Sequence, residues 1–150
     1  MKKHLSLIFA SIAWFAVIAQ YYLMIENRVT PIIETSIRFF SFFTILTNSL
    51  VAIYFTLSIL KKKIIDKPGT LTAVTVYITI VGIVYQIILR PIWKPTGLHM
   101  VVNELLHSVI PLLVILFWYL YEEKKSLTYK QLPMWLIYPF VYLLYILVRG

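Results

Sequence analysis

The chain has 150 residues, of which 61% are hydrophobic and 13% are charged; soluble domains carry about a quarter charged residues, so this composition excludes an ordinary soluble domain and indicates an integral membrane protein. It contains no cysteine, which excludes disulfides, thiolate nucleophiles and cysteine metal sites. The net charge of +8 arises from short lysine clusters between apolar segments, a pattern typical of membrane topology signals, and we therefore predict no nucleic-acid partner.

Five apolar segments predict an all-α membrane bundle that forms one domain over residues 1–150. The segments cover roughly residues 5–25, 38–60, 69–89, 98–121 and 133–148. Each of the first four has about 20 residues or more, enough for a helix to cross about 30 Å of hydrocarbon. The fifth is short and ends close to Gly150, so we expect a sixth helix to be missing at the C-terminus.

The first segment is predicted to be a retained helix and not a signal peptide. Its apolar run is longer than the roughly 7 to 15 residues of a signal core, and it lacks the small-residue spacing of a cleavage site. Alanines recur every three residues from Ala10 to Ala19. Small side chains of this kind allow a neighbouring helix to approach closely.

The basic residues predict the orientation in the cell membrane. Lysines and arginines are more frequent in cytoplasmic loops than in outer ones. We therefore expect a cytoplasmic N-terminus and an outward-facing Gly150. Nine of the fourteen basic residues fall on the predicted inner side and five on the outer side: Lys2, Lys3, Lys61, Lys62, Lys63, Lys67, Lys124, Lys125 and Lys130 against Arg28, Arg38, Arg90, Lys94 and Arg149.

The second segment carries polar residues that a continuous helix would place on one face. Arg38, Ser41, Thr44 and Asn48 are spaced by three, three and four residues, and Thr47 lies beside Thr44. Residues at this spacing stack along one side of a helix. Because the asparagine amide requires hydrogen-bond partners in lipid, this face is expected to point into the bundle, either as an interhelical hydrogen-bond patch or as part of a site.

The third and fifth segments each carry a stripe at helical spacing. Thr72, Thr75, Thr79, Gly82 and Gln86 form the first stripe, which predicts a contact with a neighbouring helix or the wall of a cavity, with Ile78 on the opposite face. Tyr138, Tyr142, Tyr145 and Arg149 form the second. It predicts helix packing or a lining for an acyl chain.

The fourth segment contains the sequence NELLH, which places Asn103, Glu104 and His107 on one helix side. A glutamate near the membrane interior is costly and indicates function. Counted at about 1.5 Å per residue from the outer boundary, Thr44 and Glu104 both lie about 9 Å deep, with Asn48 and His107 slightly deeper. The polar groups of the second and fourth segments are therefore expected in one layer. The alternative to a functional site is that His107 is a packing residue held by hydrogen bonds.

A hydroxyl beside a neutral imidazole is sufficient for nucleophilic acyl transfer. The histidine takes the hydroxyl proton and later returns it, while a third group orients the ring. Glu104 or Asn103 is a candidate for orienting His107, and the Asn48 amide is a candidate for binding an oxyanion. We predict no cofactor and no metal, because His4, His99 and His107 do not supply a ligand set.

At these residues the sequence resembles a known family. The segments FFTILTNSLVAIYF and NELLH are similar to those of the androgen-induced and androgen-dependent membrane proteins, and more so to their bacterial six-helix relatives, which share runs like FFTILTN and YPFVYLLYILVRG. The resemblance implies a Thr/His hydrolase of fatty acid esters of hydroxy fatty acids, with Thr44 as nucleophile, His107 as base and Asn103 as the asparagine of the NxxxH motif. A slipped register would put Ser41 in place of Thr44.

Two alternatives from other classes stay open. A transporter of small solutes or protons would use Arg38, Glu104 and His107 as a relay, although no internal repeat is present. A non-catalytic membrane scaffold would use the polar faces for helix packing alone. The predicted partners are membrane lipid and a long-chain acyl substrate, and the pattern does not determine an oligomeric state.

Overall fold

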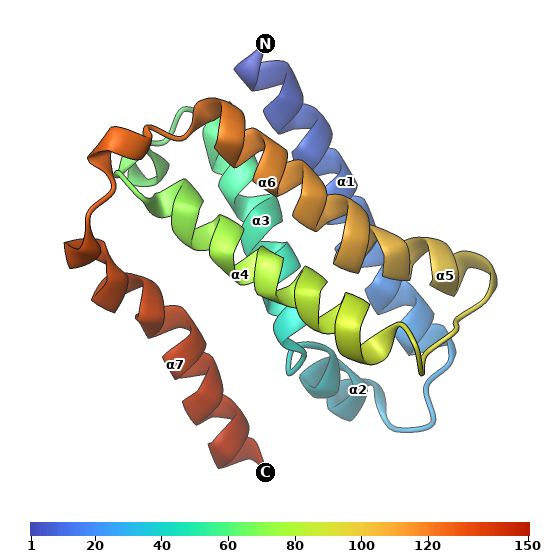
Figure 1. Ribbon diagram of the computed structural model, residues 1–150. Coiled ribbons are helices and arrows are strands. Elements are labelled where there is room, and N and C mark those ends of the chain that lie inside the picture. The colour runs from blue at the N-terminus through green and yellow to red at the C-terminus, as the bar shows by residue number, and fades with distance from the viewer.

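A computed structural model describes all 150 residues as an all-helical protein, which confirms the all-α part of the prediction (Figure 1). Its α-helices are α1 (Lys2–Glu26), α2 (Ile32–Phe39), α3 (Phe43–Ile59), α4 (Thr70–Val84), α5 (Gly97–Glu104), α6 (Ile110–Tyr121) and α7 (Leu132–Arg149). A π-helical turn, Tyr85–Leu89, extends α4, and a second, Leu105–Val109, joins α5 to α6 into one helix. Short 3-10 turns occupy Lys63–Asp66, Lys124–Ser126 and Tyr129–Gln131.

Four helices are long and apolar enough to cross a membrane, or five if the bent pair α2 and α3 forms one span. These lengths fit a multi-pass membrane protein and support a membrane location. Figure 1 shows α1, α3, α4 and the α5–α6 helix packed as a bundle, with α7 standing to one side.

The core of the bundle lies where α1, α3 and α6 meet. Ala13 and Ala16 of α1 are fully buried, so the helix approaches its neighbours closely. The rings of Phe9, Phe55 and Phe117 meet in edge contacts, with centroids 4.9 to 5.9 Å apart. Interlocking aromatic edges of this kind add to the packing energy.

The second predicted helix is broken, contrary to the continuous helix expected over residues 38–60. α2 and α3 meet at an angle of 73°. Phe42 adopts an extended backbone, while the buried ring of Phe39 packs edge-on against Tyr21 of α1 with centroids 5.0 Å apart. Burial of Phe39 accompanies the bend, and Arg38 therefore lies on another helix, off the polar face of α3.

A proline follows each π turn closely and accounts for its position. Pro91 and Pro111 have no amide hydrogen, so neither can donate to the carbonyl four residues before it. Just before them, the amides of Arg90 and Ile110 donate to the carbonyls five residues back. Such π turns occur frequently at functional sites.

The stripe on α4 contacts the α5–α6 helix, which confirms the predicted interface. Trp118 donates its indole hydrogen to Thr72 at 2.8 Å, and a Cβ on Gly82 would lie 3.2 Å from that of Pro111. Ile78, however, is fully buried. The prediction that Ile78 lies on a face free of helix contacts is therefore wrong, because α4 also packs against α3.

Candidate functional site

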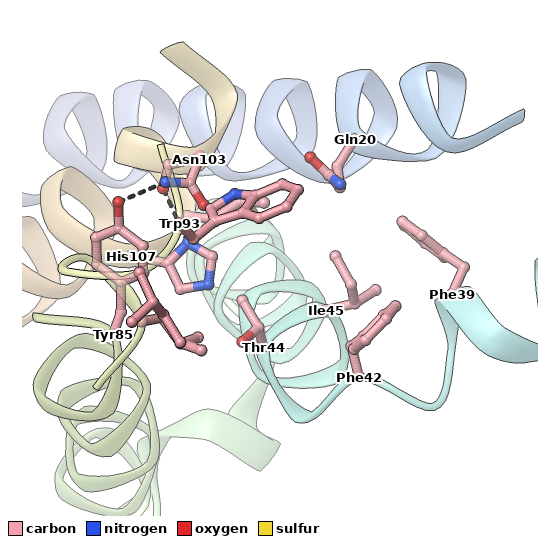
Figure 2. Close-up of a pocket in the computed structure, with 12 residues that line it drawn as sticks. Gln20, Phe39, Phe42, Thr44, Ile45, Tyr85, Trp93, Asn103 and His107 are labelled. Carbon is pink, nitrogen blue, oxygen red and sulfur yellow. Dashed lines mark hydrogen bonds between the residues drawn. The ribbon is translucent and has the colours of Figure 1, made fainter. Parts of the chain in front are cut away.

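A cavity of about 350 Å³ opens where the end of α1, the bend between α2 and α3, the π turn after α4, and α5 meet. Most of its lining is hydrophobic or aromatic (Figure 2). Its polar lining side chains include a threonine, a histidine and two amides. The full lining is Gln20, Phe39, Phe42, Thr44, Ile45, Tyr85, Leu89, Ile92, Trp93, Asn103, Leu106 and His107. The structure thus places Thr44, Asn103 and His107 around one cavity.

His107 has a fixed ring orientation. Its Nδ1 lies 2.9 Å from the carbonyl oxygen of Asn103. Since a carbonyl only accepts, Nδ1 must carry the proton, and Nε2 of the neutral ring has a free lone pair. The ring also stacks on Tyr85, with centroids 4.5 Å apart and planes 25° apart.

Tyr85 is itself held in place by the site. The side-chain amide of Asn103 donates to the Tyr85 hydroxyl at 2.6 Å. Asn103 therefore positions His107 twice, through its own carbonyl and through the ring that the imidazole stacks on. Tyr85 and His107 each lie on one of the two π turns, so both widened turns contribute to the same wall.

Thr44 lies in the first turn of α3, and its hydroxyl has no hydrogen-bond partner in the protein. Figure 2 shows the Thr44 side chain at the cavity, on the side of His107 that faces away from Asn103. Backbone bonding in this turn begins with Ile45 and Leu46, whose amides both donate to the Phe42 carbonyl. The amides before them are free donors at the positive end of the helix dipole.

Asn48 and Ser41 lie outside the cavity. The Asn48 amide donates to the carbonyls of Thr44 at 2.9 Å and Leu106 at 3.1 Å. Its hydrogens are used to tie α3 to the π turn of His107, so they are not available for the expected oxyanion contact. Ser41 donates to the carbonyl of Ile37 at 2.6 Å and faces α7.

Glu104 and Arg38 are also separate from His107 and from each other. The Glu104 carboxylate pairs with Arg90 at 3.1 Å and accepts from Ser108 at 2.7 Å. Neither contact is with His107, so these contacts do not meet the expectation that Glu104 orients the histidine. Arg38 is exposed on α2 and makes no ion pair, so the relay of Arg38, Glu104 and His107 is not assembled.

Among the cavity residues that were not predicted from the sequence, three carry a hydrogen-bonding group: Gln20, Tyr85 and Trp93. Gln20 projects into the cavity from α1 (Figure 2) and has no hydrogen-bond partner in the protein. Tyr85 follows Gly82 by three residues, so the α4 stripe continues at helical spacing through it as well as through Gln86. Gln20 gave a weaker signal, being a lone amide at the end of an apolar segment.

Comparisons with protein-family models, with curated proteins and with solved structures find no match to this chain. What the site can do therefore rests on its geometry. A free hydroxyl and a neutral imidazole with a free nitrogen face one apolar cavity. This arrangement supplies a nucleophile and a base in a place where an apolar ligand fits.

Proposed function

We propose that this protein is an intramembrane hydrolase of long-chain acyl esters, with Thr44 as nucleophile and His107 as general base. One observation carries the proposal: both residues line one cavity, and the Nδ1 contact to Asn103 leaves Nε2 of His107 as the free base. The resemblance to the androgen-induced membrane proteins assigns the same two positions. It also supports fatty acid esters of hydroxy fatty acids as the substrate class.

The reaction proceeds in two half-reactions. Nε2 of His107 accepts the Thr44 proton as the hydroxyl oxygen attacks the ester carbonyl, and the protonated ring then donates that proton to the departing alcohol. The acyl group is left on Thr44. A water molecule, deprotonated by the same nitrogen, attacks this ester and releases the fatty acid, and the proton returns to the threonine oxygen.

The negative charge on the carbonyl oxygen needs hydrogen-bond donors. The free amides in the first turn of α3 lie beside the nucleophile and carry the positive end of the helix dipole. The Gln20 amide faces the cavity from the opposite helix. These groups replace Asn48 as the oxyanion donors.

The apolar lining favours an acyl chain over a charged solute. Aromatic and aliphatic residues surround the threonine and histidine. Burying this pair costs little because both are uncharged before reaction, whereas a buried unpaired charge costs far more. The cavity lies near the start of α3, which the basic residues assign to the outer half of a cell membrane with a cytoplasmic N-terminus.

The decisive experiment measures hydrolysis of a fatty acid ester of a hydroxy fatty acid by the purified protein in detergent. We expect Thr44→Ala and His107→Ala each to reduce turnover at least about a thousandfold, and the double variant to be no worse, because the two residues act as one unit. Labelling by a fluorophosphonate is expected in the wild type and lost in Thr44→Ala.

Two matched variants control for folding and register. Thr47→Val changes the neighbouring threonine of α3, whose hydroxyl bonds Tyr138 at 2.9 Å and which lies outside the cavity. Ser41→Ala tests the alternative nucleophile. Both are expected to retain most of the activity. Wild-type turnover in Thr44→Ala, or no ester hydrolysis by the wild type, would exclude the Thr/His mechanism.

A further inference from the structure

A second pocket, of about 200 Å³, lies at the opposite end of the bundle from the cavity that Thr44 and His107 line. It forms between the start of α1, the last turns of α3 and α6, and the loop before α4. Its lining is mostly polar: Lys2, Tyr54, Ile65, Asp66, Lys67, Pro68, Leu71, Tyr121, Glu122, Glu123 and Ser126. The proposed hydrolysis uses none of these residues.

The floor of this pocket contains hydrogen-bonding groups without partners. Tyr54 is only 6% exposed and lines the pocket, yet its hydroxyl bonds to no other protein group. The Tyr121 hydroxyl and the Oε2 atom of Glu122 are also buried and have no hydrogen-bond partner. Buried polar groups are almost always hydrogen-bonded, so two buried unpartnered atoms beside the unpartnered Tyr54 hydroxyl indicate a bound species.

The chemistry of the floor specifies a hydrogen-bond donor with a positive charge. A carboxylate only accepts hydrogen bonds, and each phenol oxygen can accept one. A primary ammonium donates up to three hydrogen bonds and neutralises the carboxylate. A quaternary ammonium has no hydrogen to donate, so it would leave Glu122 and the phenols unpartnered.

The rim of the pocket carries positively charged lysines that form no ion pair. Lys2 and Lys67 line the pocket, but neither forms an ion pair with Asp66 or Glu122. Lys2 instead places its ammonium 5.8 Å from the centre of the Tyr121 ring. Lysines at this position suit a phosphate, which they bind as point charges.

We propose that this pocket binds a phosphoethanolamine group, with the ammonium on Glu122, Tyr54 and Tyr121 and the phosphate on Lys2 and Lys67. The pocket volume suits a head group and leaves no room for acyl chains. The ligand source is either a lipid head group, which lies at this depth beside the lysine-rich loops, or a soluble phosphoethanolamine ester.

The test uses the full chain, stripped of lipid in detergent, and native mass spectrometry to measure binding. Phosphatidylethanolamine, phosphatidylcholine and phosphatidylglycerol with identical acyl chains are compared, and soluble glycerophosphoethanolamine is compared with glycerophosphocholine. We expect ethanolamine forms to bind about tenfold or more tightly than choline forms, as for a charge-assisted hydrogen bond. Preference among the soluble compounds alone would identify a soluble ligand.

Variants assign the preference to the pocket. Glu122→Gln and Tyr54→Phe should each remove most of the ethanolamine preference, and Lys67→Gln should weaken ethanolamine and glycerol lipids alike. Tyr119→Phe and Lys125→Gln change exposed residues outside the pocket and should bind as the wild type does. Equal binding of ethanolamine and choline forms by the wild type would overturn the proposal without any variant, and so would an unchanged preference in Glu122→Gln.

Discussion

The α4 helix contacts two neighbours in opposite ways. Towards α6 it presents Gly82, where an added Cβ would lie 3.2 Å from the Pro111 side chain. Towards α7 it presents Tyr77, whose hydroxyl donates to the carbonyl of Trp135. The first contact is backbone against side chain, and the second is made by the tip of a long side chain. The close contact therefore belongs to the stripe, at Gly82, whereas the contact with α7 is made by Tyr77, which is not part of that stripe.

The contrast between the tightly packed bundle and the loosely attached α7 extends along the whole of α7. No residue of α7 is buried, and Figure 1 shows this helix apart from the others. Its tyrosines reach α3 and the bend before it: Tyr138 bonds Thr47 of α3 at 2.9 Å, and Tyr142 donates to the carbonyl of Ser41 in the bend at 2.8 Å. A mainly apolar groove of about 400 Å³ lies between the two helices. Close approach of the helices holds the bundle together, whereas the tyrosines of α7 hold that helix through hydrogen bonds and through ring contacts with Phe43 and Tyr77.

The largest expected effect tests the close contact. Gly82→Leu inserts a side chain where a Cβ alone would lie 3.2 Å from the Pro111 side chain and 3.3 Å from the His107 carbonyl, closer than ordinary van der Waals contact. We expect it to destabilise the protein by about 3 kcal/mol, at the upper end for overpacking, measured by thermal unfolding in detergent. Ile80→Leu is the matched control, because Ile80 is half exposed on the same helix. Similar melting of both variants would contradict the tight interface.

This interface was predictable from the sequence, and the bend between α2 and α3 was not. Glycine and threonine at helical spacing indicate close approach in a membrane helix whatever the neighbour is. The bend depends on Phe39 finding a buried place against Tyr21 of α1, a tertiary contact that no local pattern contains. Residues 38–60 are apolar enough throughout to look like one helix.

The second prediction concerns the hydrogen bonds inside the bundle. Asn48 is fully buried and bridges α3 to the carbonyl of Leu106. Asn48→Ala removes both amide contacts and is expected to cost about 1 to 2 kcal/mol of stability. If α3 and the π turn are joined mainly by apolar packing instead, the melting temperature will stay within error of the wild type.

A smaller effect is expected where α7 joins the bundle. Tyr138→Phe removes one hydrogen bond to Thr47 but keeps the ring, so we expect a loss of about 0.6 kcal/mol, the average for such bonds in membranes. Amide hydrogen exchange should rise in α7 and stay unchanged in α4. A uniform rise through the whole bundle would show that α7 is part of the core and is not held separately from the other helices.

The candidate site was predictable only in part. Thr44 and His107 could be paired by counting depth along two helices that run in the same direction, and this needs no tertiary detail. The ring orientation could not be predicted, because it depends on two π turns created near Pro91 and Pro111. An ideal helix would also have placed Glu104 near His107, whereas in the structure its carboxylate pairs with Arg90 across the helix interface.

The smallest effect is expected at that ion pair. A closed ring of hydrogen bonds joins the two π turns, with distances of 2.6 to 3.1 Å; its members are Arg90, Gln86, Ser108 and Glu104.

The Arg90 side chain is 51% exposed and that of Glu104 is 33% exposed, and exposed ion pairs contribute about 0 to 1 kcal/mol to stability. Glu104→Gln removes the charge and keeps one oxygen acceptor, for either Ser108 or Arg90, where the carboxylate has one for each. We therefore expect a loss of stability below about 1 kcal/mol and an ester hydrolysis rate near that of the wild type, since the Asn103 carbonyl, and not this carboxylate, fixes His107. A rate that falls severalfold at unchanged stability would instead assign Glu104 to the orientation of the histidine, and the ring would then belong to the cavity wall and not to the interface between α4 and the α5–α6 helix.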